Sequence, residues 1–412
     1  MAFLTTAALG ANSQLQAASG TWSAPGGGQY STPGNWSGGI PDGESDSATF
    51  TDAGGGTVQI NGNPTIQKII FDGSASAYLI APPNDITQAV IGSSIEATGT
   101  GANAQVISAS VKRRGSTTIS NNYDSAEHTL TLSGNLIGWT NVSTTLTLGG
   151  SNTGANTISG VINDDTTGSK TTLTKTGTGT WILSGQNTYK GDTNINGGML
   201  YITGVHLPNT LSTYTIDGGA LGGVMGTIGA SSVTLMGTAG SSINVSGMGL
   251  GSIGSQNALS TPGELSMDLE GGTLDISQAG AGALKFVLNT PGASDTIRIS
   301  NDTLEIGEGV LGISNFTFDT SNWEEEGAEG TYVLFSTTSV GNISGFLDDE
   351  NLSTILGGYR LTLSLGTGEY DTNTLELDVA AVPEPSLLSA LLVGTVLLLG
   401  ARRWRRQSPV PR

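Results

Sequence analysis

The sequence contains no cysteine and only two histidines, His128 and His206, among its 412 residues. The absence of cysteine excludes disulfide bonds and thiolate metal sites. Two histidines in unrelated sequence contexts argue against a hydrolytic triad or a histidine metal centre. We therefore predict no cofactor and no metal site, and we expect both histidines to be exposed at turns or strand edges.

Charged residues are also scarce, and many of the apolar residues are glycine. Hydrophobic residues other than glycine make up 36% of the chain and charged residues 12%, whereas charged residues average about 25% in globular domains. Such a chain buries little apolar surface in any one place. It can fold if its apolar residues form a thin, continuous stripe, as they do in a repetitive solenoid.

The charge is strongly negative and unevenly placed. The formal net charge is −19, and five of the 15 basic residues lie in the last eleven positions, which leaves 10 basic against 34 acidic residues elsewhere. Phosphate groups would be repelled by so acidic a body, which argues against nucleic-acid binding. The balance suits a soluble protein exposed outside the cell.

Glycine is abundant, with 63 residues, and the segments between glycines are short and alternate in polarity. Leu and Thr alternate in Thr129–Leu132, in Thr145–Leu148 and in Leu361–Leu363, so that one face of each segment is apolar and the other is hydroxylated. Glycine and β-branched residues interrupt every candidate amphipathic helix. The pattern predicts an all-β protein.

The β segments repeat. "TLTLSGN" at Thr129, "TLTLGGSN" at Thr145 and "WILSGQN" at Trp181 share a strand followed by Gly and Asn, and Gly-Gly-x-Leu recurs at Gly197, Gly218 and Gly271. Spacings of 16 and 21 residues, read from these positions, suit one coil of a β-solenoid whose neighbouring coils share a core.

The clearest unit, Leu173–Thr203, reads "LTKTGTGTWILSGQNTYKGDTNINGGMLYIT". It closely resembles the autotransporter-associated β-strand repeat of bacterial passenger domains. The resemblance covers these 31 residues and implies a right-handed parallel β-helix. It implies nothing about chemistry. Because end coils of a solenoid need caps, we interpret Trp22 and Trp36 as covering one end, with stacking on carbohydrate as the alternative.

The end of the chain combines three features. Val382-Pro383-Glu384-Pro385 precedes sixteen residues without charge, and Arg402, Arg403, Arg405 and Arg406 follow. A helix over residues 386–401 would be about 24 Å long and predicts a single transmembrane helix whose flanking arginines stay cytoplasmic. Residues 382–406 resemble the PEP-CTERM sorting signal, which implies recognition by an exosortase, cleavage near Pro385 and release to the cell surface or extracellular matrix.

These observations divide the chain into segments. Residues 2–10 are apolar but lack a basic leader, which we interpret as a signal peptide with its front missing. We predict a signal peptide at residues 1–18, a Trp-containing cap at 19–75, a β-solenoid at 76–282, a C-terminal β region or cap at 283–380, and the sorting signal at 382–406.

Candidate catalytic groups are few. Two G-x-G-x-x-G matches, Gly249–Gly254 and Gly307–Gly312, are expected by chance at this glycine content and open no helix in a βαβ unit, so nucleotide binding is rejected. The remaining clusters are expected to be solvated turns that do not converge on one substrate, because adjacent strand residues face opposite ways. These clusters are Lys112-Arg113-Arg114, Asp164-Asp165, Glu324-Glu325-Glu326 and Asp348-Asp349-Glu350.

The sequence thus predicts an exported, non-enzymatic β-solenoid that acts as a structural or adhesive element at the cell surface or in the extracellular matrix. Its expected partners are an exosortase-type enzyme, the inner membrane until processing, and extracellular polysaccharide or neighbouring surface proteins. The alternative is a surface carbohydrate-active enzyme, a polysaccharide lyase or hydrolase on a β-helix. Two carboxylates in one cleft within about 10 Å would favour that enzyme.

Overall fold

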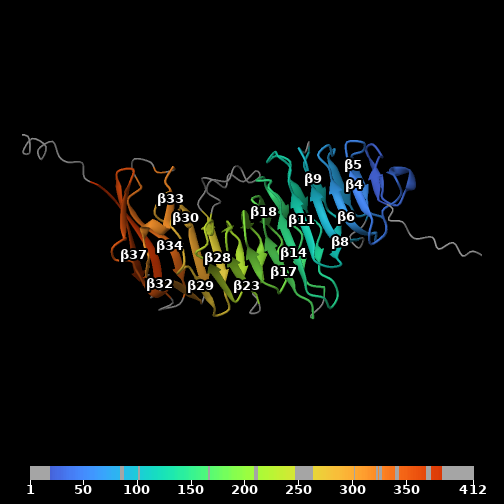
Figure 1. Ribbon diagram of the computed structural model, residues 1–412. Coiled ribbons are helices and arrows are strands. Elements are labelled where there is room, and N and C mark those ends of the chain that lie inside the picture. The colour runs from blue at the N-terminus through green and yellow to red at the C-terminus, as the bar shows by residue number, and fades with distance from the viewer. Residues whose placement is uncertain are drawn as a thin grey trace, which may run out of the picture.

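The protein is an elongated stack of short β-strands, seen in a computed structural model with the N-terminal strands at one end and the C-terminal strands at the other (Figure 1). The structure describes residues 19–83, 88–100, 103–165, 168–207, 212–245, 263–300, 302–321, 323, 327–338, 343–367 and 373–382. Within these ranges the helical elements are two short 3-10 turns, Pro33–Asn35 and Ile313–Asn315, and no helix has the length and apolar character needed to cross a membrane.

From β17 on, the chain visits three sheets in turn, and each circuit is one coil of a solenoid, whereas the strands before β17 belong to sheets 1 and 2. β17 in sheet 1 is followed by β18 in sheet 2 and β19 in sheet 3, and β20 then returns to sheet 1 beside β17 in parallel register. The next circuit repeats this order through β21, β22 and β23. The predicted all-β fold of stacked parallel strands is therefore confirmed, and its right-handed sense stays a prediction.

The strand bounds in each sheet are as follows. Sheet 1 contains β1 (Gly20–Trp22), β3 (Trp36–Ser37), β4 (Ser47–Phe50), β6 (Thr65–Phe71), β8 (Gln88–Ala97), β10 (Ser110–Arg113), β11 (Thr117–Asn121), β13 (Leu136–Ile137), β14 (Thr144–Gly149), β16 (Ile162–Asn163), β17 (Thr171–Lys175), β20 (Thr193–Ile195), β23 (Thr213–Ile216), β26 (Ser232–Leu235), β29 (Thr273–Asp275), β32 (Thr303–Leu311) and β35 (Ile343–Leu347). Sheet 2 contains β2 (Gly27–Gln29), β5 (Gly56–Gln59), β7 (Tyr78–Ala81), β9 (Gln105–Ile107), β12 (Leu130–Leu132), β15 (Asn156–Ile158), β18 (Thr180–Leu183), β21 (Met199–Ile202), β24 (Ala220–Gly222), β27 (Ser242–Asn244), β30 (Leu284–Val287) and β33 (Phe316–Asp319). Sheet 3 contains β19 (Gln186–Asn187), β22 (Val205–His206), β25 (Thr227–Gly229), β28 (Glu264–Asp268), β31 (Thr296–Ser300), β34 (Gly330–Thr337), β36 (Ser353–Leu356), β37 (Tyr359–Thr367) and β38 (Asn373–Ala381).

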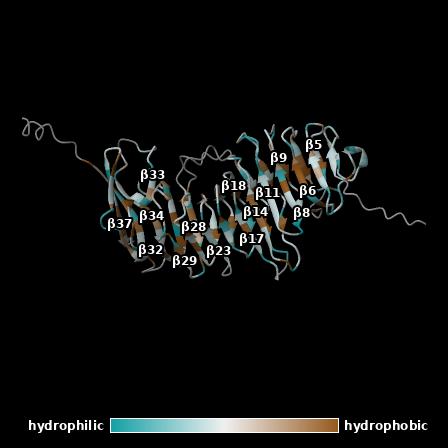
Figure 2. Ribbon diagram, in the orientation of Figure 1, coloured by the Kyte–Doolittle hydropathy of each residue, from teal (hydrophilic) through white to brown (hydrophobic). Residues whose placement is uncertain are grey.

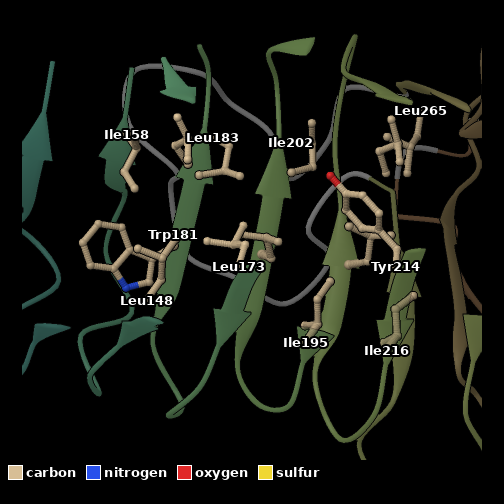
Figure 3. Packing of buried hydrophobic residues seen from close by; sticks show 14 of the residues in the cluster. Leu148, Ile158, Leu173, Trp181, Leu183, Ile195, Ile202, Tyr214, Ile216 and Leu265 are labelled. Carbon is tan, nitrogen blue, oxygen red and sulfur yellow. The ribbon is translucent and has the colours of Figure 1, made fainter. Parts of the chain in front are cut away.

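The core is a thin column inside the coils, as the low apolar content predicts. Leu146 of β14 is paired with Leu173 of β17, and both are fully buried, while the flanking threonines are half-buried. Trp181 of β18 points into the same column from sheet 2 (Figure 3). Figure 2 shows the resulting alternation of hydrophobic and hydrophilic positions along the strands. Each buried leucine contributes about 1.5–3 kcal/mol.

Glycines recur because turns of neighbouring coils lie in backbone contact. Gly177 has φ +67°, and a Cβ built on it would lie 2.4 Å from the carbonyl oxygen of Gly150 one coil earlier. Gly150 in turn has φ +100°, and its Cβ would lie 2.0 Å from the Asn121 carbonyl oxygen. A side chain at either position would push the coils apart, so the repeated Gly after each strand preserves the stacking distance.

The first strands bury an aromatic cluster. Trp22 and Trp36 lie edge to face at 5.1 Å, and Phe50 packs against both. Trp22 is fully buried and Trp36 nearly so. Neither indole is therefore available to stack on carbohydrate. The role of the two tryptophans as a cap on one end of the solenoid stays a prediction.

The last strands change direction. β31 pairs with β34 in parallel, whereas β34, β38, β37 and β36 pair antiparallel. Residues 331–335 lie within β34. Antiparallel pairing ends the regular succession of coils here, although β36 keeps one unpaired edge within the described residues.

Candidate functional site

The predicted sorting residues lie at the border of the described structure. Val382 follows β38, and its N–H donates to the Gly358 carbonyl oxygen at 2.9 Å. Pro383, Glu384 and Pro385, the helix predicted at 386–401, and Arg402, Arg403, Arg405 and Arg406 lie outside the described residues, as does the signal peptide predicted at 1–18. The sorting signal and the membrane helix therefore stay predictions.

The basic cluster Lys112-Arg113-Arg114, expected to be a solvated turn, contacts the acidic pair Asp164-Asp165. The Lys112 ammonium lies 3.2 Å from a carboxylate oxygen of Asp165. The strand register explains this contact, because Lys112 is paired with Ile137 and Ile137 with Asn163, two residues before Asp165. Lys112 and Asp165, which are 53 positions apart in the sequence, are therefore neighbours although they lie on different coils.

Asp165 is held by more than the lysine. Its carboxylate also accepts a hydrogen bond from the Thr140 hydroxyl. That bond is the main cause that lowers the pKa of Asp165, with Lys112 adding to it and partial desolvation opposing it. The arrangement ties the segments after β13 and β16 to β10, and the lowered pKa favours the ionised form of the Asp165 carboxyl.

Trp139 completes this patch. Lys112 lies 5.3 Å and Arg114 6.0 Å from the ring centroid, within the range of cation–π attraction. Arg114 also forms an ion pair with Glu44. Both surface cations are therefore paired with carboxylates, and the patch is nearly neutral despite its basic sequence.

A shallow groove of about 250 Å³ lies next to Arg114. Its lining includes a single carboxylate, that of Glu44, together with uncharged residues and Arg114. Glycoside hydrolysis needs two carboxyl groups flanking one bond, and this groove offers one that is already paired. The lining residues are Glu44, Thr65, Ile66, Gln67, Gly92, Arg114 and Gly115.

Arg113 is inside the solenoid, so its prediction as part of a solvated turn is wrong. Alternation along β10 turns its side chain inward, where it is fully buried. Its guanidinium donates to the hydroxyls of Thr171 at 2.7 Å and Thr144 at 3.3 Å. Burial lowers the pKa of Arg113 to about 10, while Asp164 opposes that shift. Arg113 thus links β10 to two later coils.

Asp164 supports this internal bridge and is likewise not a free acid. Its carboxylate accepts from the backbone N–H of Thr171 at 2.6 Å and of Lys190 at 3.1 Å. Thr171 therefore connects Asp164 with Arg113 through its backbone and its hydroxyl. Asp164 and Asp165 are therefore not simple solvated turn residues, because each carboxylate makes a contact between coils.

The histidine prediction is half wrong. His128 is half-buried near a turn, but His206 in β22 is fully buried. Its ring stacks on Tyr189 at 4.1 Å and makes hydrogen bonds to the Tyr189 carbonyl oxygen at 2.8 Å and the Tyr214 hydroxyl at 2.9 Å. Desolvation lowers the pKa of His206, against raising effects from the Tyr189 carbonyl and Asp164.

Lys175 is a second buried base. It ends β17 with its side chain inward, and its ammonium donates to the carbonyl oxygens of Thr176 at 2.7 Å and Gly197 at 2.9 Å. Burial lowers its pKa to about 8. The sequence marks Lys175 as a repeat position, but its link to the next coil depends on the fold.

The remaining acidic runs do not assemble a site in the described structure. Asp348, Asp349 and Glu350 form a turn after β35, and Glu324, Glu325 and Glu326 lie outside the described residues. Within the described ranges, no three His, Asp or Glu side chains are close enough to hold a metal ion. Gly307 to Leu311 lie in β32, and Gly249–Gly254 lie outside the described residues.

Comparison with known proteins identifies one segment. Residues 173–202 match the family described as Passenger-associated-transport-repeat. In addition, the Adhesin BmaC autotransporter of Brucella suis biovar 1 (strain 1330) is 47% identical over 83 residues, which cover 20% of this chain and 2% of that protein. The resemblance of Leu173–Thr203 to an autotransporter-associated repeat is thus confirmed. The matched unit runs from β17 to β21, one coil and part of the next.

Proposed function

We propose that this chain is an exported β-solenoid that acts as a structural or adhesive element at the cell surface or in the extracellular matrix. The observation that carries the proposal is the passenger-type repeat at residues 173–202, built into an uninterrupted stack of parallel coils. The similarity to an autotransporter adhesin supports a surface role. Because the alignment covers 2% of that adhesin, adhesion is a proposal for this chain.

The described side chains support display as the mechanism. Charged residues near the candidate groove are paired with one another, and the buried bases Arg113, Lys175 and His206 connect coils. A rigid rod of this kind presents long side-chain rows along its axis, and many weak contacts along a row give avidity. A polysaccharide-cleaving enzyme, the alternative, has no observation in its favour among these contacts.

We further propose that residues 382–406 direct sorting. The Pro-Glu-Pro motif would be recognised by an exosortase-type enzyme, residues 386–401 would hold the chain in the inner membrane until cleavage, and the arginines 402–406 would remain cytoplasmic. The body would then be released to the surface or the matrix.

The test is the intact mass and location of the mature protein in a host that carries an exosortase and in a matched host that lacks it. A secreted form ending near Pro385 in the first host alone is the expected result. A variant with Pro383→Ala, Glu384→Ala and Pro385→Ala should remain full length in both hosts. A full-length, membrane-held parent protein in both hosts would refute sorting by this signal.

A further inference from the structure

Two rows of hydroxyl side chains run across the outer face of sheet 1. In β14, Thr145 and Thr147 flank the buried Leu146, and both threonines are half-buried on the opposite side of the strand. β17 repeats this pattern with Thr172 and Thr174 around Leu173. The same spacing recurs in the two later strands β23 and β26. We call these residues the hydroxyl track: Thr145, Thr147, Thr172, Thr174, Thr213, Thr215, Ser232 and Thr234.

The rows are in register from coil to coil. Thr147 is paired with Thr174, and Thr174 with Asn194 of β20. Asn194 is paired with Thr215, which is paired with Thr234. None of these pairings contains a register shift. One row therefore crosses five strands without a break, with an amide in place of a hydroxyl at β20.

The second row follows the first, two residues earlier in each strand. Thr145 is paired with Thr172, and Thr213 with Ser232. Between these two pairs of strands lies β20, and Asp192 occupies the row just before it. The Asp192 carboxylate accepts hydrogen bonds from the N–H and the hydroxyl of Thr213 at 2.9 and 3.1 Å. Strand geometry places neighbouring strands about 4.7–4.9 Å apart and the two rows about 6.6–6.8 Å apart.

The track is uncharged in a strongly acidic protein. β14, β17, β20, β23 and β26 are described in full, and none of their outward positions carries a charged or aromatic side chain. The charged residue Lys175 in this set points into the core. The carboxylate of Asp192 stands in the second row and already accepts two hydrogen bonds from Thr213. An anionic ligand thus finds no complementary charge on this surface, and a single sugar ring finds no aromatic platform. The chemistry fits a neutral, repetitive, hydroxylated polymer.

We propose that the hydroxyl track binds a neutral, linear polysaccharide in an extended conformation, lying along the solenoid axis across the strands. This inference rests on the surface role proposed above. An extended 1,4-linked chain advances by nearly one strand spacing per sugar, so successive sugars meet successive threonines. Each hydroxyl contact is weak in water, and binding therefore depends on repeating the contact over many coils.

The test uses the full-length protein and pull-down on three insoluble neutral polymers: cellulose, chitin and mannan. We expect retention on at least one of them that is insensitive to salt, because no charges are neutralised. Short oligosaccharides of the same polymer should compete poorly, and soluble alginate should not compete. Binding that alginate or salt abolishes would assign the contact to charged groups outside the track and overturn the proposal.

The matched variants are two cross-strand pairs. Thr147→Val with Thr174→Val removes two hydroxyls from the track while keeping the branched side-chain shape, and about tenfold weaker retention is expected from the loss of two hydrogen bonds. Thr131→Val with Thr157→Val changes a directly paired couple on sheet 2 and should leave retention unchanged. Equal effects of the two variants, with both folded by circular dichroism, would refute the track as the binding surface.

The outcomes separate this inference from the proposed function. A protein that reaches the surface through its sorting signal but binds none of the three polymers refutes the polysaccharide track alone. A protein that binds a polymer through Thr147 and Thr174 but is not exported refutes the surface role alone. Retention that rises with protein concentration because copies of the chain associate through the track would identify a second copy as the occupant. That outcome would overturn the proposal.

Discussion

The Tyr214 hydroxyl lies 2.9 Å from Nδ1 of His206 inside the solenoid. Nε2 of the same ring faces the Tyr189 carbonyl oxygen at 2.8 Å, and because a carbonyl accepts, Nε2 carries the proton. Nδ1 then accepts from Tyr214. The neutral imidazole is therefore the form that the interior satisfies, and a second proton on Nδ1 would displace the tyrosine's hydrogen bond.

This geometry predicts a loss of stability in mild acid. Burial lowers the pKa of His206 in the folded protein, so the unfolded chain takes up a proton near pH 6.5 before the folded chain does. The stabilisation is complete above that pH and declines as the pH falls toward the folded pKa, by at most about 1.4 kcal/mol per pH unit. Urea unfolding at pH 7, 6 and 5 measures this slope.

His206→Phe should flatten the slope between pH 7 and 5, although it also lowers stability at pH 7 by removing two hydrogen bonds. Leu207→Ala is the control, because it changes an exposed side chain next to His206 in the sequence, leaves both histidines in place and should keep the parental slope. An unchanged slope in His206→Phe would show that His206 does not cause the acid sensitivity.

The contact between Gly177 and Gly150 predicts that stacking, and not φ alone, excludes side chains from these turns. Gly177→Ala places a Cβ 2.4 Å from the Gly150 carbonyl oxygen, whereas Gly271→Ala, also at positive φ (+87°), meets nothing within 4 Å. Gly271→Ala should cost about 1–2 kcal/mol of left-handed strain, and Gly177→Ala about 1–3 kcal/mol more from overpacking. Denaturant unfolding of both variants measures the difference, and equal losses would contradict the stacking argument.

The repeat is also where sequence reasoning succeeds. The Leu-Thr alternation predicts which side of β14 and β17 faces the core, and both strands follow it, because alternation is local to one strand. The Gly and Asn residues that recur after the strands predict the coils in the same way, because this pattern is also local in the sequence. These features need no knowledge of which strand lies next to which.

Contacts between coils could not be predicted this way. Lys112 meets Asp165, and Arg113 meets Thr171, across separations of 53 and 58 residues. Those pairs depend on coil lengths that vary along the chain, since the links from β10 to β13 and β16 set the register. The polar residues inside the solenoid were missed because an arginine, a lysine and a histidine resemble surface residues until their partners on other coils are known.

The burial of Trp181 leads to a prediction of how much the repeat contributes to the stability of the whole protein. Its indole is fully buried and donates from Nε1 to the Gly149 carbonyl oxygen at 2.9 Å. Trp181→Ala should lower the free energy of unfolding by about 3–5 kcal/mol through the cavity it leaves, and Trp181→Phe by about 1–3 kcal/mol through the unpaired carbonyl. Leu207→Ala, at a side chain that is 42% exposed, should stay within about 0.5 kcal/mol. A Trp181→Ala loss as small as the control's would contradict the column of core residues as the source of stability.

The burial of Lys175 predicts that the free energy of unfolding rises at alkaline pH. Its pKa falls from 10.5 to about 8 on burial, so between these values the unfolded chain holds a proton that the folded chain has released. The free energy of unfolding therefore rises with pH across this window, by up to about 1.4 kcal/mol per unit, and is lowest, as far as Lys175 is concerned, below pH 8. Urea unfolding between about pH 7.5 and pH 8.5 measures this rise, because tyrosines of the unfolded chain, whose pKa is about 10, are almost fully protonated in that range.

Lys175→Met should abolish this alkaline rise, because it removes the titrating amine and fills the same inward position. Lys170→Met is the matched control: Lys170 lies five residues earlier, at an exposed position before β17, and its replacement should leave the rise intact. If only Lys175→Met loses the rise, burial of the charged ammonium between the Thr176 and Gly197 carbonyls lowers the free energy of unfolding, and deprotonation removes that loss. An identical rise in both variants would refute Lys175 as its source.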